Sequence, residues 1–136
     1  MDREELKHRT KLFALHVIRF VTSMPANAVS RVLGNHLLRA GTSVGANYRA
    51  ACRARSRPDF ISKIGVVEEE ADEALYWLVV IAESGTVKSN GISSLIAEAQ
   101  ELVAIFTATG RSTKASGYLP NPKSGQIRNP KSDIRN

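Results

Sequence analysis

Five arginines with the chemistry to bind phosphate fall within one short part of the chain. They are Arg39, Arg49, Arg53, Arg55 and Arg57. Arg49, Arg53 and Arg57 follow one another at steps of four residues. On a continuous helix this spacing places their guanidinium groups along one side. Guanidinium forks pair with phosphate oxygens. Only Tyr48 supplies an aromatic ring nearby, so base stacking is not indicated. The pattern suits contact with the phosphate backbone of a nucleic acid.

The arginines have two other interpretations that the sequence leaves open. An acidic run follows in the next segment, and it supplies partners for ion pairs within or between subunits: Glu68, Glu69, Glu70, Asp72 and Glu73. A plain solvated surface is the third interpretation. The charge balance favours an acidic partner, because the chain carries a formal net charge of +6 that its own acids do not neutralise.

The charge is strongly polarised along the chain. Residues 25–58 carry six arginines and no acid, whereas residues 59–110 carry nine acids and two lysines. Residues 111–136 are basic again, with six basic side chains and one acid. A basic segment that is followed by an acidic one suits contacts between helices or between subunits as well as contacts with nucleic acid.

Small residues directly precede the arginines. Gly41 and Gly45 lie four residues apart, and Ala46 follows them. On a helix, a stripe of small residues lets a second backbone approach closely. Asn47 falls near the apolar face, and a buried amide there fixes register or oligomeric state. The sequence leaves open whether the close partner is another helix of the same bundle or a neighbouring subunit.

Four segments have the spacing of amphipathic helices, and none alternates with the period of a strand. We expect helices that end at Met24, run from about Ala28 to Arg55, run from Ser56 to Gly85, and run from Ser93 to Gly110. Four such helices with short connections predict an all-α fold, an antiparallel up-down four-helix bundle over residues 1–110.

The same spacing predicts the buried positions. For the second helix they are Val29, Leu33, Leu37, Ala40, Val44, Tyr48 and Ala51. For the third they are Phe60, Ile64, Val67, Ala71, Ala74, Leu78 and Ile81. For the fourth they are Leu95, Ala99, Leu102 and Phe106. With only 6% aromatic residues, we expect an aliphatic, alanine-rich core.

Residues 111–136 differ from the rest of the chain. The stretch NPKSGQIR is followed directly by its near-repeat NPKSDIRN, and there is little apolar mass. This composition predicts a basic, disordered C-terminal tail. Such a tail either adds weak nucleic-acid affinity or is a solvated extension.

The residue pattern contains no catalytic, metal or cofactor signature. One Glu-x-x-His unit, at Glu5 and His8, has no second copy, so a carboxylate-bridged metal pair is not indicated. Cys52 is the only cysteine, which excludes an internal disulfide and indicates a reducing compartment. We expect a cytoplasmic protein that is not an enzyme, with no cofactor, no metal and no membrane association.

Three runs of residues carry a resemblance to a known family. They are Thr42-Ser43-Val44-Gly45-Ala46-Asn47, Arg55-Ser56-Arg57-x-Asp59-Phe60, and Glu70-Ala71-Asp72-Glu73 through Tyr76-Trp77-Leu78. The chain resembles, over about residues 5–110, the four-helix bundle family known from proteins encoded in intervening sequences of bacterial 23S ribosomal RNA genes, the ribosomal-S23-like proteins.

The resemblance implies an assembly. Family members look like up-down bundles that form cyclic homopentamers, with no established catalytic activity. The family is distantly similar to the accessory variability protein of diversity-generating retroelements, a basic pentamer that works with a reverse transcriptase and nucleic acid. Relatives commonly read Asn-Tyr-Arg-Glu-Ala where this chain has Ala50, so an ion pair is lost here or the local surface is more basic.

Two hypotheses of function follow. The first is a non-enzymatic, oligomeric nucleic-acid-binding bundle, with structured RNA as the favoured partner, that contacts phosphates through the arginines and the basic tail. The second is a protein-interaction scaffold that docks a reverse transcriptase or another polymerase, with the arginines committed to protein contacts.

Overall fold

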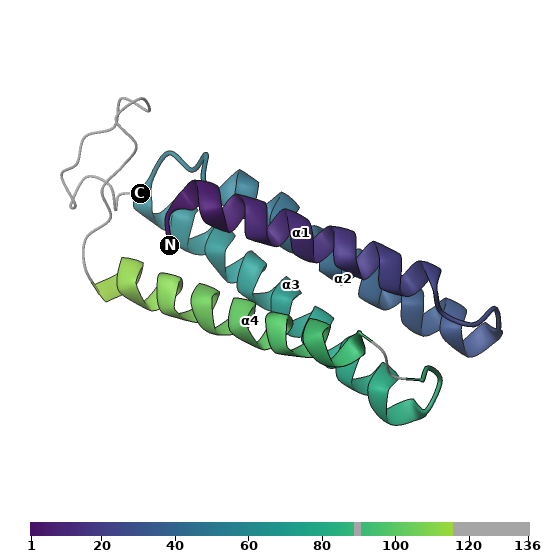
Figure 1. Cartoon of the computed structure of the whole chain (residues 1–136). Coiled ribbons are helices and arrows are strands. Elements are labelled where there is room, and N and C mark those ends of the chain that lie inside the picture. Colours follow the sequence, from purple (N-terminus) through teal and green to yellow (C-terminus); the bar gives the residue numbers. More distant parts are fainter. Residues whose placement is uncertain (89–90, 116–136) are drawn as a thin grey trace.

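The computed structural model describes residues 1–88 and 91–115, which form four α-helices (Figure 1). In chain order these are α1 (Arg3–Thr22), α2 (Ala28–Ala51), α3 (Arg57–Ser84) and α4 (Ile92–Ala115). No strand occurs in these two described ranges. Each helix runs antiparallel to the one before it (Figure 1), so the predicted all-α up-down four-helix bundle is confirmed.

Side-chain caps mark where the helices begin. Ser56 Oγ accepts a hydrogen bond from the backbone N–H of Asp59 at 3.2 Å, as expected for the start of α3. Asp2 and Asn27 cap α1 and α2 in the same way. Gly85 ends α3 with a φ of 75°, a left-handed conformation that glycine adopts without steric cost. The start and end predicted for α3 are confirmed.

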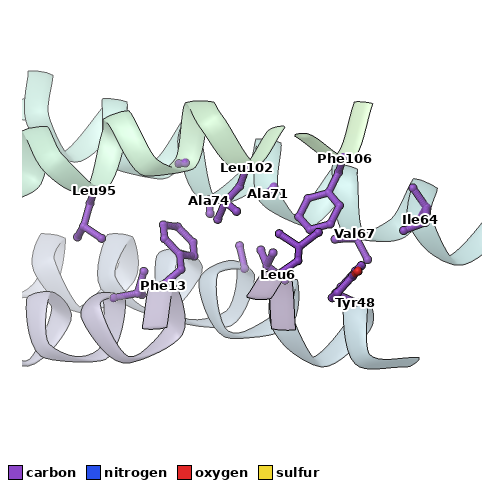
Figure 2. Close-up of a cluster of buried hydrophobic side chains, with 14 of the residues drawn as sticks. Leu6, Phe13, Tyr48, Ile64, Val67, Ala71, Ala74, Leu95, Leu102 and Phe106 are labelled. Atoms are coloured by element: carbon purple, nitrogen blue, oxygen red, sulfur yellow. The ribbon is translucent and has the colours of Figure 1, made fainter. Parts of the chain in front are cut away.

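The core follows the predicted spacing closely in α3 and α4. All seven positions predicted for α3 and all four predicted for α4 are buried. Figure 2 shows Leu6 of α1, Tyr48 of α2 and Phe106 of α4 in one region between the helices, with Phe13 of α1 further along the bundle toward Leu95. The rings of Tyr48 and Phe106 lie 5.4 Å apart between their centroids. Apart from Phe60 and Cys52, aliphatic side chains and alanines make up the rest of the hydrophobic core, as the composition predicts.

The prediction for the start of α2 is wrong at Val29. This side chain is 55% exposed, and the buried positions of the first turns are Ser30 and Gly34. The reason is the close approach of α1. A Cβ atom on Gly34 would lie 3.2 Å from Cγ1 of Val21, so only small residues fit between the two helices there.

Two predicted helix ends also differ from the structure. α2 ends at Ala51, four residues before Arg55, because the chain turns there through i→i+3 hydrogen bonds of Arg53 and Ala54. α4 does not end at Gly110 but continues to Ala115. Residues 111–115 are therefore helical. The disorder predicted for the remaining tail, residues 116–136, falls outside the described residues.

The bundle is least closed between α1 and α4, which pack against each other far less than the other three neighbouring pairs do. A groove of about 560 Å³ runs along this seam, with Phe13, Phe20 and Leu95 among its lining residues. Arg9 crosses one end of the seam. Its Nε and Nη2 donate to the two carboxylate oxygens of Glu98 at 2.6 and 2.8 Å.

Candidate nucleic-acid interface

The arginines do not form the helical ridge that their spacing predicts. Arg49 lies in the last turn of α2, Arg53 lies in the connection that follows, and Arg57 is the first residue of α3. The prediction is wrong because it needs α2 to continue to Arg55, and α2 ends at Ala51. A continuous helix is therefore not what groups these side chains.

The fold nevertheless brings three of the five predicted arginines to one place. Arg49, Arg53 and Arg55 line a hollow of about 510 Å³ at the end of α2. The other residues of its wall are Ala46, Ala50, Asp59 and Lys63. Within the described ranges none of the three arginines has an ion-pair partner, whereas Lys63 pairs with Asp59 at 2.7 Å.

A second hollow continues this surface toward α1. It has a volume of about 590 Å³ and is lined by Glu4, Lys7, His8, Lys11, Ala14, Thr42, Gly45, Ala46 and Arg49. Ala46 and Arg49 belong to both hollows, so the two are adjacent. We call the lining of both hollows the basic surface. Lysines and arginines outnumber acids on it by six to two, and Lys7 is paired with Glu4 at 3.2 Å.

The sequence reasoning missed the lysines of this surface. Lys7 and Lys11 come from α1, far from the arginines in sequence, and Lys63 comes from α3, eight residues after Arg55. One signal was available for Lys63, which is one of two lysines in the acidic segment 59–110. It follows Asp59 by one helical turn, close to the predicted start of that helix.

Arg39 lies away from the basic surface and is committed to protein contacts. Its Nη2 donates to Oε2 of Glu73 at 2.7 Å, and its Nη1 lies 3.9 Å from Oε1 of Glu70. Arg39 stands ten residues before Arg49, or about 15 Å along the axis of α2. The structure therefore separates it from the other arginines and pairs it with the acidic helix α3.

Arg57 is also engaged within the protein. Its Nη2 donates to the backbone carbonyl of Lys114 at 2.7 Å, in the last turn of α4. The last carbonyls of a helix have no partner within the helix and attract cations. The arginine thereby links the start of α3 to the end of α4.

The small residues that precede the arginines in α2 have a structural explanation. A Cβ atom on Gly41 would lie 2.9 Å from both methyl groups of Val17, and one on Gly45 would lie 3.2 Å from Oγ1 of Thr10. The two glycines therefore lie against α1 of the same chain. Ala46 is exposed on the basic surface, where its short side chain leaves room between the hollows.

Asn47 does not reach a second helix through a hydrogen bond. Its Nδ2 donates to the carbonyl of Ser43 at 2.8 Å, within α2. The side chain is half-buried rather than buried. The amide is satisfied inside its own helix, so its role in fixing a subunit register stays a prediction.

Two ionisable side chains have pKa values that the fold displaces. The carboxylates of Glu98 and Glu101 accept hydrogen bonds from Arg9 and raise the pKa of its guanidinium above the ordinary range. Burial, together with a hydrogen bond to Cys52, raises the pKa of Tyr48 above its ordinary range. Both shifts favour the protonation states present at neutral pH, so neither creates an acid or a base for catalysis.

No residues suited to a metal or a reactive thiol stand out in the described part of the chain. Residues 1–88 and 91–115 hold no group of three or more His, Cys, Asp and Glu side chains that could bind a metal ion. Cys52 is a free, buried thiol.

Helix α4 is long and apolar enough to cross a membrane, with a mean hydropathy of 1.2 over its best window. Core helices of soluble proteins meet the same criterion. In this fold, Leu95, Leu102 and Phe106 of α4 are buried in the bundle, and Glu98 is paired with Arg9.

Comparison with known proteins assigns the chain. The family model described as 23S rRNA-intervening sequence protein matches residues 4–108. The chain belongs to the 23S rRNA-intervening sequence protein family. The resemblance seen in the sequence is thereby confirmed. The matched residues include the whole basic surface.

A solved structure agrees with this assignment. It is a protein with unknown function from the S23 ribosomal protein family of Bacteroides thetaiotaomicron. It is 27% identical to this member of the 23S rRNA-intervening sequence protein family, with a TM-score of 0.74. The alignment covers 82% of this chain and 99% of that one. None of the curated proteins matches the chain.

Proposed function

We propose that this protein is a non-catalytic RNA-binding bundle that holds structured RNA by its phosphate backbone. The observation that carries the proposal is the grouping of Arg49, Arg53 and Arg55 around one hollow, none of them in an ion pair within the described ranges. Guanidinium groups without carboxylate partners are free to pair with phosphate oxygens. Lys7, Lys11 and Lys63 extend the positive charge over three helices.

The chemistry of the surface favours structured RNA over a single strand. No Phe, Tyr or Trp side chain lines either hollow, and His8 is the one ring among the lining residues described, so the surface lacks a series of rings on which successive bases could stack. Double-stranded RNA is recognised mainly by shape and by contacts with phosphate and 2′-hydroxyl groups. A basic surface without Phe, Tyr or Trp side chains fits that kind of contact.

Ala50 adds to the argument, since it lies in the wall of the arginine hollow. A glutamate at this position would place a carboxylate among three guanidinium groups and would compete with phosphate for them. The short, neutral side chain instead leaves the charge of the hollow unopposed. This supports a phosphate-binding role for the hollow in this chain.

The experiment measures binding of a structured RNA by fluorescence anisotropy across a salt series. For the double variant Arg49→Ala with Arg53→Ala, we expect weaker binding and a slope of log K against log salt that is flatter by about 1.4–1.8, because two phosphate contacts are lost. Ala50→Glu is also expected to weaken binding. Arg39→Ala is the matched control, and it is expected to leave the slope unchanged because Arg39 is already paired with Glu73.

A protein-interaction scaffold is the second candidate function. Two of the five predicted arginines, Arg39 and Arg57, make contacts within the chain and so supply fewer free guanidinium groups for phosphate than the sequence predicts. A scaffold would dock a polymerase or another protein and would bind RNA no better than background. Equal salt slopes for the wild-type protein and the Arg49→Ala, Arg53→Ala variant would favour this candidate over RNA binding.

A further inference from the structure

Three guanidinium groups gather around one hollow at an end of the bundle. Arg49, Arg53 and Arg55 line this arginine hollow, and all three side chains are exposed. Within residues 1–88 and 91–115, none of the three donates a side-chain hydrogen bond or belongs to an ion pair. Figure 1 shows that the connection from α2 to α3 lies at the end of the bundle where the chain begins. The hollow therefore presents uncommitted donors at one end of the molecule.

The backbone that carries these arginines is anchored to the bundle. In the connection after α2, the buried side chains of Cys52 and Ala54 alternate with the exposed arginines. The backbone N–H of Ala54 donates to the carbonyl of Ala51 at 3.0 Å. Nη1 of Arg3, in α1, donates to the carbonyl of Cys52 at 3.3 Å. A connection held in this way positions its side chains before a ligand arrives, which lowers the entropic cost of binding.

The acid in the wall of the hollow does not neutralise the arginines. Asp59 accepts a hydrogen bond from Nζ of Lys63 at 2.7 Å, so these two opposite charges offset each other. The rest of the wall is Ala46 and Ala50, which carry no charge and little volume. Three guanidinium charges are therefore left unopposed around a hollow of about 510 Å³.

The second hollow, beside α1, has a different character. It shares Arg49 with the arginine hollow, and Lys7 and Lys11 of α1 also line it. Lys7 is paired with Glu4 at 3.2 Å, whereas Lys11 has no ion-pair partner in the described ranges. Lysine offers a single point of charge, and arginine offers a planar fork of donors. The basic surface thus concentrates its forks at one point, where a surface that only follows a phosphate backbone would spread them evenly.

The two kinds of phosphate in RNA differ in what they offer to guanidinium groups. An internal phosphodiester carries one negative charge on its two non-bridging oxygens. A terminal monoester carries a charge of about −1.5 to −2 at pH 7 and has three strong acceptor oxygens. Each guanidinium fork pairs with two oxygens of such a group. Three forks around one hollow exceed what one diester can use, and they match a monoester.

We propose that the arginine hollow binds the terminal phosphate monoester of an RNA. The inference rests on the proposed RNA binding and adds which part of the RNA the hollow holds. Arg49, Arg53 and Arg55 surround the oxygens of the monoester, and the phosphates that follow lie along the second hollow, beside Lys11. The bundle thereby distinguishes a phosphorylated RNA end from a hydroxyl end and from an internal position.

The test uses the full chain and one RNA hairpin, labelled in its loop, that ends in a 5′-hydroxyl, a 5′-monophosphate or a 3′-monophosphate. Fluorescence anisotropy measures each Kd. One phosphorylated hairpin is expected to bind about tenfold more tightly than the hydroxyl hairpin, because hydrogen bonds between charged groups are strong. The hairpin that gains affinity identifies the end that is bound. The same end blocked as a methyl phosphodiester is expected to bind like the hydroxyl hairpin.

Two variants separate recognition by the fork from attraction of charge. Arg53→Lys keeps the positive charge but loses the fork, and it is expected to reduce the preference for the phosphorylated end to about threefold or less. Its affinity for the hydroxyl hairpin and its salt slope are expected to stay close to those of the wild type. Lys11→Ala is the matched control. It is expected to weaken the binding of the phosphorylated and hydroxyl hairpins by the same factor, so that the preference remains.

Equal binding of all the hairpins would overturn the terminal-phosphate site and would leave the proposed RNA binding in place. A preference that survives Arg53→Lys would also overturn it, because charge alone would then account for the preference. Adenosine 5′-monophosphate that displaces the hairpin at concentrations near the Kd of the hairpin would overturn the assignment to an RNA end in favour of a free nucleotide. No binding of any hairpin at low salt would overturn the site and the proposed function together.

Discussion

At the scale of single residues, glycine at position 41 is required by the distance between two helices. A methyl group there would lie 2.9 Å from two carbons of Val17, whose side chain is fully buried and cannot move aside. Forcing extra volume into a packed core costs about 1–3 kcal/mol. The two helices can be this close only while position 41 carries no side chain.

We therefore expect Gly41→Ala to lower the free energy of unfolding by about 1–3 kcal/mol, measured by urea denaturation. Gly65→Ala is the matched control. Gly65 is also helical, but an added Cβ would have no neighbour within 4 Å. It is expected to raise stability by about 0.5–1 kcal/mol, because alanine favours a helix over glycine. Equal effects of the two substitutions would contradict the close approach of α1 and α2.

The buried hydroxyl of Tyr48 leads to a prediction about the stability of the fold at alkaline pH. Burial raises the pKa of its hydroxyl above the ordinary value of about 10. The unfolded chain then loses this proton at a lower pH than the folded chain does. Its contribution to stability is complete below about pH 10 and is lost as the pH rises further.

Chemical denaturation at a series of pH values between about 9 and 11 tests whether stability falls as the pH rises. We expect the free energy of unfolding to fall more steeply with pH in the wild-type protein than in Tyr48→Phe, which has no proton to lose. The lysines titrate in both proteins and cancel in the comparison. Parallel curves would mean that Tyr48 is not held in its neutral form by the core.

At the scale of helices, the sequence predicts the middle of each element better than its ends. The seven buried positions of α3 follow steps of three and four without interruption, and all seven are buried in the structure. The end of α2 was missed because Ala54 continues the spacing and is itself buried, although it lies beyond the helix. Burial in a turn and burial on a helix face look alike in a sequence.

The candidate interface was predictable only in part for the same reason. Arg49, Arg53 and Arg55 do come together, but a turn groups them, not a helical ridge. Spacing along the sequence carries no information about Lys7 and Lys11, which reach the surface from another helix. The pairing of Arg39 with α3 likewise depends on which helices become neighbours.

The hydrogen bond from Arg57 of α3 to Lys114 of α4 leads to a prediction about the stability of the two helix ends. Arg57 donates to the carbonyl of Lys114, so residues 111–115 and the start of α3 stabilise each other. In the full chain, Arg57→Ala is expected to lower the free energy of unfolding by about 1 kcal/mol. In a chain that ends at Gly110 the acceptor is gone, and we expect the substitution to have no effect. Chemical denaturation of the wild type and of Arg57→Ala, each in both chain lengths, gives the coupling energy between Arg57 and residues 111–136.

If Arg57→Ala lowers the free energy of unfolding equally in both chain lengths, the arginine stabilises the fold through another contact. The comparison also decides where the folded unit stops. If the coupling is present, a truncation at Gly110 damages the bundle, whereas one at Ala115 leaves every described contact in place.

At the scale of the whole molecule, charge is divided between sides of the bundle. The basic surface lies where α1, the end of α2 and the start of α3 meet. The exposed acids Glu69, Asp72 and Glu83 lie along the outer face of α3. The basic surface and these exposed acids therefore lie on different parts of the bundle.

The most direct test of the central claim is the binding of a structured RNA by the full chain and by a chain that ends at Ala115. Fluorescence anisotropy across a salt series measures both. We expect the shorter chain to keep most of the affinity, with a log–log salt slope that corresponds to several phosphate contacts, at about 0.7–0.9 per contact. Loss of binding on truncation, or no binding by either chain at low salt, would contradict RNA binding by the basic surface of the bundle.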